Sequence, residues 1–224
     1  MDLVQRYEHV FDYVSRTLPD DSVFSWIREE TGRRGIPEIE ITPAQGRLLN
    51  LLATLVGARR IVEVGTLGGY STVWLARALP ADGRLITLEI EPTHAELACD
   101  SVEQAGLSDR VEVIVGPALD SLQSLELDAP VDMVFIDADK PANRDYFDWA
   151  LDHVRPGGLI IVDNVLLNAR VVTNLDSPYY DTLRAFNNYV AQRFGDSTTI
   201  VPFYKDEERN LDALMIVRVP EPAR

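Results

Sequence analysis

From residue 60 onward, short apolar runs rich in β-branched side chains alternate with stretches whose apolar positions repeat at helical spacing. Such runs are typical of strands buried on both faces of a parallel sheet. The expected strands are Arg60–Val64, Leu85–Glu89, Val111–Val115, Met133–Ile136, Leu159–Val162, Thr198–Val201 and Ala213–Val217. The expected helices between them are Tyr70–Ala78, Pro92–Gln104, Asn143–His153 and Tyr180–Arg193. The pattern predicts a doubly wound, mainly parallel α/β sheet of seven strands. Since no helix separates the last two strands, we expect them to form an antiparallel pair at one edge.

The N-terminal part of the chain is predicted to form a helical arm with a break around Pro19. Before the break, the apolar positions at helical spacing are Leu3, Tyr7, Val10, Phe11 and Val14. After it, a second short helix carries Phe24, Trp26 and Ile27. Thr42 followed by Pro43 is typical of an N-cap and the first residue of a further helix, which runs towards Gly57.

Composition and charge limit the classes of function. The chain has 224 residues, which suits one domain, with 46% hydrophobic and 25% charged residues, as in soluble globular proteins. Its net charge of −15 argues against nucleic acid or an anionic membrane as a partner. The only cysteine is Cys99, so no disulfide forms within the chain. With no membrane-length apolar run and no signal-peptide pattern at the start, we expect a cytoplasmic protein.

Carboxylates follow two of the expected strands directly. Asp137 ends one apolar run, and Asp163 with Asn164 ends another. The carboxyl ends of parallel strands meet at one edge of a sheet, so these side chains are expected to lie around one point, with Lys140 one turn further on. Three oxygen ligands suit a hexacoordinate cation such as Mg²⁺. The sequence therefore predicts a metal site with a base beside it.

The loop after the first strand carries the signs of a nucleotide-like ligand. Glycines from Gly65 to Gly69 open a helix, where backbone can approach a ligand closely. Glu89 ends the next strand and could accept hydrogen bonds from both hydroxyls of a ribose. Glu63 adds a negative charge close by, which suits a cationic cofactor such as S-adenosylmethionine better than a pyrophosphate. Taken alone, the glycine loop could equally be a structural turn, and Glu89 a solvated acid.

These motifs together resemble a known family. The chain is similar to the cation-dependent, S-adenosylmethionine-dependent O-methyltransferases of the catechol and caffeoyl-CoA type, from about residue 39 to residue 219. The matching segments are Glu63-Val64-Gly65-Thr66, Gly69-Tyr70-Ser71, Gly116-Pro117-Ala118, Phe135-Ile136-Asp137-Ala138-Asp139-Lys140 and Asp163-Asn164. The resemblance implies a single Rossmann-like class I methyltransferase domain over residues 1–224, with an arm at 1–40 and a core at 41–224.

The resemblance also implies roles for individual residues. Asp137, Asp163 and Asn164 would bind the metal, and Lys140 with Asp137 would be catalytic, Lys140 as the general base. The implied cofactor residues are Ile41, Glu63, Gly65, Thr66, Ser71, Glu89, Ala118, Asp139 and Tyr146. The implied substrate is a small phenolic vicinal diol, and the implied assembly is a homodimer.

The expected chemistry is methyl transfer from the sulfonium of the cofactor to a metal-acidified phenol. A cation chelated by two vicinal hydroxyls lowers their pKa, and Lys140 takes the proton if a nearby cation and partial burial lower its own pKa. Two alternatives stay open: a nicotinamide-dependent dehydrogenase, and a cofactor-binding oligomer without catalysis. The three histidines are too scattered for a zinc site. Neither the identity of the diol nor the role of the charged segment 205–210 is given by the sequence.

Overall fold

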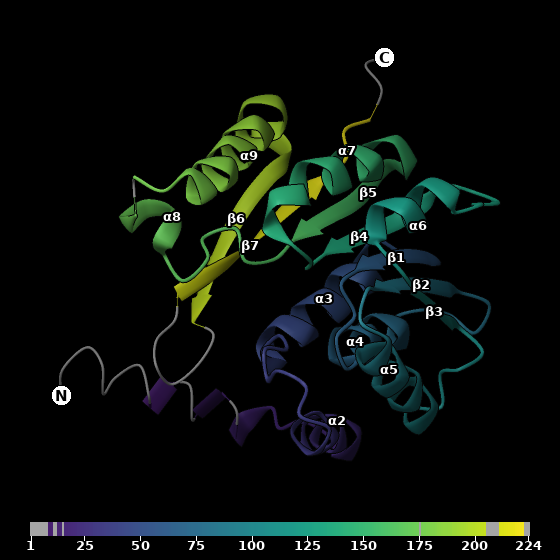
Figure 1. The fold of residues 1–224 in the computed structure, drawn as a ribbon. Helices are drawn as coiled ribbons and strands as arrows, with labels where there is room; N and C mark the ends of the chain where they lie inside the picture. The colour runs from purple at the N-terminus through teal and green to yellow at the C-terminus, as the bar shows by residue number, and fades with distance from the viewer. Residues whose placement is uncertain (1–8, 11–12, 15, 175, 205–210, 222–224) are drawn as a thin grey trace.

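A computed structural model describes residues 9–10, 13–14, 16–174, 176–204 and 211–221 (Figure 1). Its centre is a seven-stranded sheet of order β3-β2-β1-β4-β5-β7-β6, which confirms the predicted α/β class. The strands are β1 (Arg60–Val64), β2 (Arg84–Glu89), β3 (Val111–Val115), β4 (Val131–Ile136), β5 (Val154–Val162), β6 (Thr198–Tyr204) and β7 (Leu211–Arg218). The predicted antiparallel pair is confirmed, and β7 lies between β5 and β6, antiparallel to both.

Helices cover both faces of the sheet. They are α2 (Ser22–Arg33), α3 (Pro43–Leu55), α4 (Tyr70–Arg77), α5 (Pro92–Gln104), α6 (Ala118–Ser124), α7 (Asn143–His153), α8 (Arg170–Thr173) and α9 (Pro178–Phe194), with 3₁₀ turns at Lys140–Ala142 and Gly195–Ser197. The predicted bounds of α5 and α7 are confirmed. The sequence pattern missed α6 and α8, because seven and four residues are too short to show a helical period.

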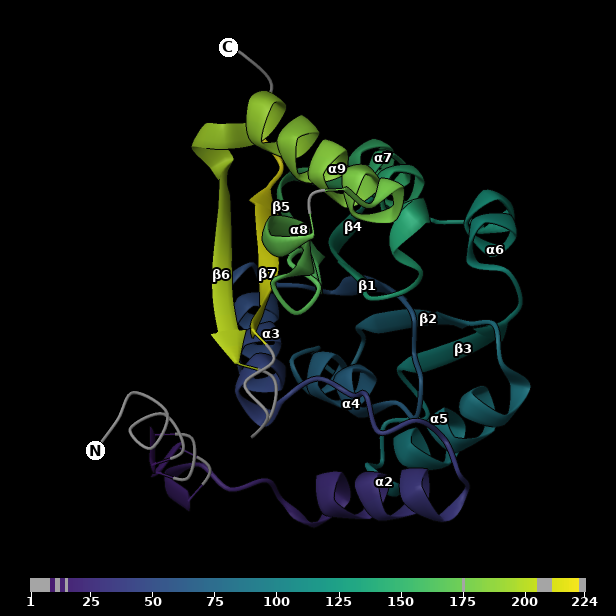
Figure 2. The same ribbon diagram turned by 60° about the vertical axis from the view of Figure 1, so that its left-hand side comes forward.

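The packing of helices on both faces of the sheet follows from the alternation of side chains along each strand. Phe135 of β4 belongs to a core shared with α2, α3, α4 and α5, whereas the adjacent Ile136 belongs to a core shared with α7 and α9. Successive strand side chains point to opposite faces, so every residue of β4 is buried. Figure 2 shows the two groups of helices on opposite sides of the sheet. This burial on both faces explains why the strands read as unbroken apolar runs in the sequence.

Gly65 leaves room for the backbone of Asp137 where β1 and β4 end side by side. Its φ is +95°, and a Cβ atom there would collide with the backbone oxygen of Asp137. The backbone N–H of Asp137 in turn donates to the Val64 carbonyl over 2.8 Å. Any side chain at position 65 would therefore push apart the two strand ends that border the candidate site.

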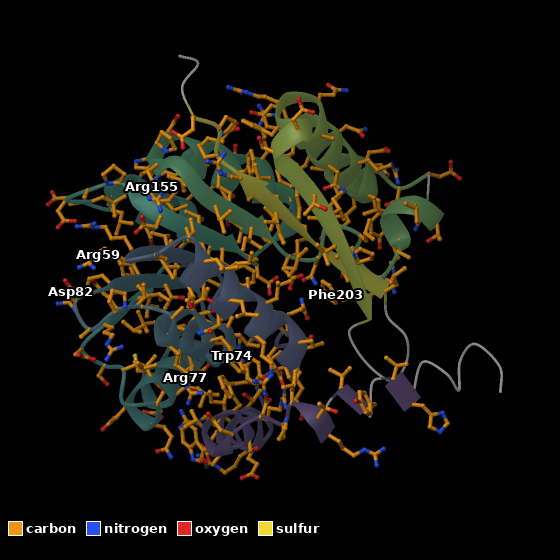
Figure 3. The ribbon with its side chains drawn as sticks, turned by 180° about the vertical axis from the view of Figure 1, so that it is seen from behind. Arg59, Trp74, Arg77, Asp82, Arg155 and Phe203 are labelled. Carbon is orange, nitrogen blue, oxygen red and sulfur yellow. The ribbon has the colours of Figure 1, made fainter. Side chains whose placement is uncertain are left out.

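At the opposite ends of the strands, where β1, β4 and β5 begin, Asp132 of β4 connects neighbouring strands. Its carboxylate accepts the backbone N–H groups of Arg59 and Arg60 at 2.8 and 2.9 Å, and Nε of Arg155 at 2.6 Å. These partners come from the beginnings of β1 and β5. In Figure 3, Arg59, Asp82 and Arg155 lie on the side of the molecule away from Phe203. This cluster fixes the strand starts, whereas the candidate chemistry lies at the strand ends.

The N-terminal arm packs through α2. Phe24 of α2 is fully buried and stacks on Trp74 of α4, with ring centroids 4.3 Å apart. Of the earlier apolar stripe, Val10 and Val14 are helical and exposed, while Leu3, Tyr7 and Phe11 lie outside the described residues. No helix in the described part of the chain is long and apolar enough to cross a membrane.

Candidate functional site

A cavity of about 480 Å³ opens at the carboxyl ends of β1, β2 and β4. Eight of the nine predicted cofactor residues line it, namely Ile41, Gly65, Thr66, Ser71, Glu89, Ala118, Asp139 and Tyr146. The candidate catalytic and metal-binding residues Asp137, Lys140 and Asn164 line it as well. One cavity thus brings together a predicted cofactor site and a predicted metal site from segments spread over more than 120 residues of sequence.

Glu89 organises the loop that follows β1. Its Oε2 accepts the backbone N–H groups of Thr66 at 3.2 Å and Leu67 at 2.7 Å, and its Oε1 accepts the N–H of Glu91 at 3.0 Å. A carboxylate can accept about four hydrogen bonds, so one position on Oε1 remains for a ligand. His94 lies close to this position, with Nδ1 3.6 Å from Oε1.

Glu63 does not line the cavity but lies fully buried behind its wall. Its Oε2 accepts the hydroxyl hydrogens of Thr72 at 2.5 Å and Thr87 at 2.7 Å, and its Oε1 has no hydrogen-bond partner among the described residues. Burial raises the pKa of Glu63 to about 7, against the opposing effect of the hydroxyl donors. A direct contact of Glu63 with the cofactor stays a prediction.

The strand ends that carry the candidate metal ligands are neighbours, as the sequence predicted. Ile136 of β4 pairs with Val162 of β5, and the N–H of Asp163 donates to the Ile136 carbonyl over 2.9 Å. Asp137 and Asp163 are therefore the first residues after two adjacent strands that end side by side. The following residue, Asn164, has a left-handed φ of +58°, a conformation that asparagine tolerates better than most residues.

Lys140 is buried in the 3₁₀ turn that follows β4, and its Nζ contacts Asp137 Oδ1 at 2.9 Å. Burial lowers the pKa of Lys140, but the carboxylates of Asp137, Asp163 and Asp212 outweigh that effect and raise it above its ordinary value. Three negative charges around one ammonium group are the reason. The lowered pKa expected from the sequence was conditional on a nearby cation, so it stays a prediction.

The donor set fits a hard divalent cation. Asp137 and Asp163 supply carboxylate oxygens, and the amide nitrogen of Asn164 is buried without a hydrogen-bond partner in the described structure, so that this amide is not tied into the fold. Across the described residues, no group of three or more His, Cys, Asp or Glu side chains is arranged to hold a metal. A cation site here would need the Asn164 amide as its third protein ligand, with oxygen ligands from water or substrate completing the shell.

Two polar residues beside the site were missed from the sequence. Gln45 of α3 places its amide nitrogen 3.3 Å from both carboxylate oxygens of Asp163. A Thr-x-x-Gln capping box starting at Thr42 marks its position, but its contact 118 residues away leaves no local signal. His94 lines the cavity from the first turn of α5, where its nearness to Glu89 in sequence was the available signal.

Comparison with known proteins identifies the family of this chain. A profile of the O-methyltransferase family matches residues 14–199, which include both strand ends and the glycine loop. The chain belongs to this O-methyltransferase family. The assignment overturns the alternative of a nicotinamide-dependent dehydrogenase, and it confirms the resemblance seen in the sequence motifs.

The relatives of this methyltransferase include curated catechol O-methyltransferases. It is 42% identical over 219 residues to that of Niastella koreensis, covering 96% of this chain and 99% of the relative. It is 44% identical over 162 residues to that of Mycobacterium tuberculosis, covering 72% of this chain and 73% of the relative.

Solved structures of similar proteins identify the cofactor. The O-methyltransferase TomG of Streptomyces achromogenes, in complex with S-adenosylmethionine, is 40% identical with a TM-score of 0.87 and covers 99% of this chain and 100% of its own. A Bacillus cereus O-methyltransferase with S-adenosylhomocysteine is 40% identical with a TM-score of 0.86, covering 96% and 100%. The methyltransferase described here is S-adenosylmethionine-dependent and acts on a small molecule.

Proposed function

We propose that this methyltransferase moves the methyl group of S-adenosylmethionine to one hydroxyl of a catechol-type vicinal diol, with a divalent cation held by Asp137, Asp163 and Asn164. The observation that carries the proposal is the cluster of these side chains with Lys140 at the ends of β4 and β5, beside the cavity. Oxygen donors of this kind suit Mg²⁺, and a vicinal diol offers two further oxygen ligands. The catechol O-methyltransferase names of two relatives support the same acceptor class.

On the cofactor side of the cavity, the chain's task is to bind and orient. S-adenosylmethionine supplies a methyl group bound to a sulfonium sulfur. When the methyl group is transferred, the rest of the cofactor leaves as a neutral thioether. The remaining acceptor position on Glu89 Oε1 would hold a ribose hydroxyl. The backbone of Gly65 and Thr66 and the side chain of Ser71 would border the methionine part, and Ala118 the adenine. Most of the rate enhancement would come from this positioning.

On the acceptor side, Asp137, Asp163 and Asn164 would hold the cation, and Lys140 Nζ would receive the proton of the reacting hydroxyl. A bound divalent cation lowers the pKa of a chelated diol and orients its oxygens. Without such a cation, the surrounding carboxylates keep Lys140 as an ammonium, which has no lone pair for a proton. Carboxylates whose charge is neutralised stabilise that ammonium less, so the pKa of Lys140 would fall towards the range that a general base needs.

A methyl-transfer assay over paired acceptors tests this function. The panel contains vicinal diols of catechol, caffeoyl and flavonoid type, each matched with a monophenol of the same skeleton that lacks one hydroxyl. After removal of metals with EDTA, we expect no turnover of the diols, recovery on addition of Mg²⁺, and little turnover of the monophenols. Full activity in excess EDTA would contradict the cation, and equal turnover of the monophenols would contradict the diol.

Further proposals concern assembly, domain organisation and location. A homodimer is supported by the exposed apolar side chains Val10, Tyr13 and Val14 of the N-terminal arm. A monomer at micromolar concentration in sedimentation would contradict it. The division into an arm (1–40) and a Rossmann-like core (41–224) of one domain, and a cytoplasmic location, stay predictions.

A further inference from the structure

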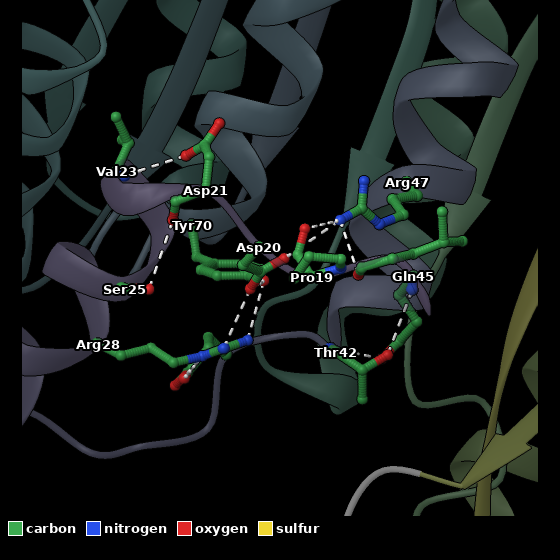
Figure 4. A network of polar contacts seen from close by, with 12 residues as sticks. Pro19, Asp20, Asp21, Val23, Ser25, Arg28, Thr42, Gln45, Arg47 and Tyr70 are labelled. Atoms are coloured by element: carbon green, nitrogen blue, oxygen red, sulfur yellow. Dashed lines mark hydrogen bonds and ion pairs between the residues drawn. The ribbon is translucent and has the colours of Figure 1, made fainter. Parts of the chain in front are cut away.

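Gln45 makes two sets of hydrogen bonds in the first turn of α3. Towards its own helix, its Oε1 accepts the backbone N–H of Thr42 at 2.9 Å, while its backbone N–H donates to Thr42 Oγ1 at 3.2 Å (Figure 4). Towards β5, its Nε2 lies 3.3 Å from each of the two carboxylate oxygens of Asp163. The side chain is only 3% exposed, so both sets are sheltered from water.

The contact with Asp163 restrains the plane of its carboxylate. A donor placed equally far from both oxygens forms a three-centre hydrogen bond, which is longer than a single bond but favours one orientation of the acceptor. Asp163 is fully buried, and its Oδ1 also accepts the N–H of Asn164 at 2.7 Å. The orientation of this candidate ligand is therefore set partly by a helix distant in sequence.

The chemical type of the donor matters as much as its position. Lys140, which contacts Asp137, is a cation and would compete with a metal ion for its carboxylate. Gln45 is neutral, so it donates hydrogen bonds to Asp163 and leaves the full negative charge available to a cation. Partners of this kind orient metal ligands in other proteins, and their loss typically weakens metal binding about 10- to 100-fold.

We propose that Gln45 is a positioning residue that orients Asp163 for the divalent cation. The inference rests on the cation site of the proposed function. The competing explanation is that Gln45 serves only the capping box of α3. If Gln45 orients Asp163, weakening the cap at Thr42 alone should leave cation binding unchanged. If Gln45 serves only the cap, removing its amide should affect cation binding no more than weakening the cap at Thr42 does.

The experiment compares Gln45→Met with Thr42→Ala in the full-length protein loaded with S-adenosylhomocysteine. Gln45→Met keeps the side-chain length and removes the amide, whereas Thr42→Ala removes the Oγ1 acceptor of the cap and leaves the Gln45 amide in place. Mn²⁺ is titrated into each protein and the free ion is followed by electron paramagnetic resonance. Calorimetry gives the affinity for S-adenosylhomocysteine, and thermal unfolding gives the stability.

We expect Gln45→Met to weaken Mn²⁺ binding about 10- to 100-fold while the affinity for S-adenosylhomocysteine stays within about twofold. Thr42→Ala is expected to lower the unfolding temperature without changing Mn²⁺ affinity. Should Gln45→Met not fold, Gln45→Ala replaces it with the same expectation. Unchanged Mn²⁺ affinity in the Gln45 variant, or an equal loss in Thr42→Ala, would overturn the inference alone. A wild-type protein that binds no Mn²⁺ would overturn the cation site as well.

Discussion

Tyr70 donates its phenolic hydrogen to Asp20 Oδ2 over 2.6 Å, which ties the wall of the cavity to the segment that precedes α2 (Figure 4). Arg28 of α2 completes the cluster, with donors 2.9 Å from the Tyr70 hydroxyl, 3.0 Å from Asp20 and 3.1 Å from Glu40. Tyr70 and Glu40 both line the cavity. The N-terminal arm is thus joined to the cavity by partly buried polar contacts as well as by apolar packing.

Replacing Asp20 with alanine tests this joint. The substitution leaves the buried Tyr70 hydroxyl without its acceptor and the Arg28 guanidinium without one carboxylate. We expect a loss of about 1–3 kcal/mol in the free energy of unfolding, and faster amide hydrogen exchange in Ser22–Arg33. Asp128→Ala is the matched control, because Asp128 forms an exposed ion pair with Arg60 and we expect little effect there. Equal behaviour of the two variants would show that the joint contributes nothing.

Glu63 is expected to make stability depend on pH. Its pKa is about 7 in the folded protein, above the ordinary value of 4.5, so the folded state binds more protons between these two values. The contribution of Glu63 to the stability of the wild type therefore falls as pH rises from about 4.5 to 7. Glu63→Gln mimics the protonated form, and at pH 8 we expect it to exceed the wild type by on the order of 3 kcal/mol. Below pH 4.5 the difference should vanish.

Urea unfolding of the cofactor-free protein across this pH range measures the effect. Glu96→Gln, an exposed acid on α5, is the control and is expected to follow the wild-type profile. A Glu63→Gln variant whose stability runs parallel to the wild type at every pH would mean that Glu63 titrates normally.

Glu89 is expected to determine cofactor affinity. Alanine at this position removes the acceptor for three loop N–H groups as well as the free position on Oε1. We expect S-adenosylmethionine to bind about 10- to 100-fold more weakly, corresponding to about 1–3 kcal/mol. Calorimetry measures the dissociation constant, with Glu96→Ala as the control. An unchanged constant would exclude Glu89 from ribose binding.

Lys140 is expected to affect the rate more than binding. Lys140→Met should leave cofactor affinity within a few-fold while lowering the single-turnover rate about 100-fold, the lower end of the range for a general base, because a metal-acidified diol needs less help. The rate should partly recover as pH rises and hydroxide replaces the base.

Asp163→Ala is expected to behave differently from Lys140→Met and to lose diol binding and rate together. A Lys140→Met rate equal to wild type from about pH 6 to pH 9 would remove Lys140 from the mechanism.

The sequence by itself determined the α/β sheet and the place of its chemistry. Strands buried on both faces need continuous apolar runs, and these runs predicted β1 and β3 with their observed bounds and the other strands with ends shifted by up to five residues. Because parallel strands end at one edge, the acids after β4 and β5 could be expected to meet, and the register of Ile136 with Val162 places them side by side. Hydrophobic periodicity and strand direction were sufficient to predict the sheet and the position of these acids.

Only the tertiary structure decided the contacts between distant segments and their electrostatic consequences. The bond of Gln45 to Asp163 spans 118 residues and that of Tyr70 to Asp20 spans 50, and neither leaves a periodic pattern in the chain. Asp137, Asp163 and Asp212 together raise the pKa of Lys140, and Asp212 of β7 reaches the site because β7 inserts beside β5. The sequence shows which titratable side chains are present. Their pKa values depend on burial and on neighbouring charges, which only the folded structure determines.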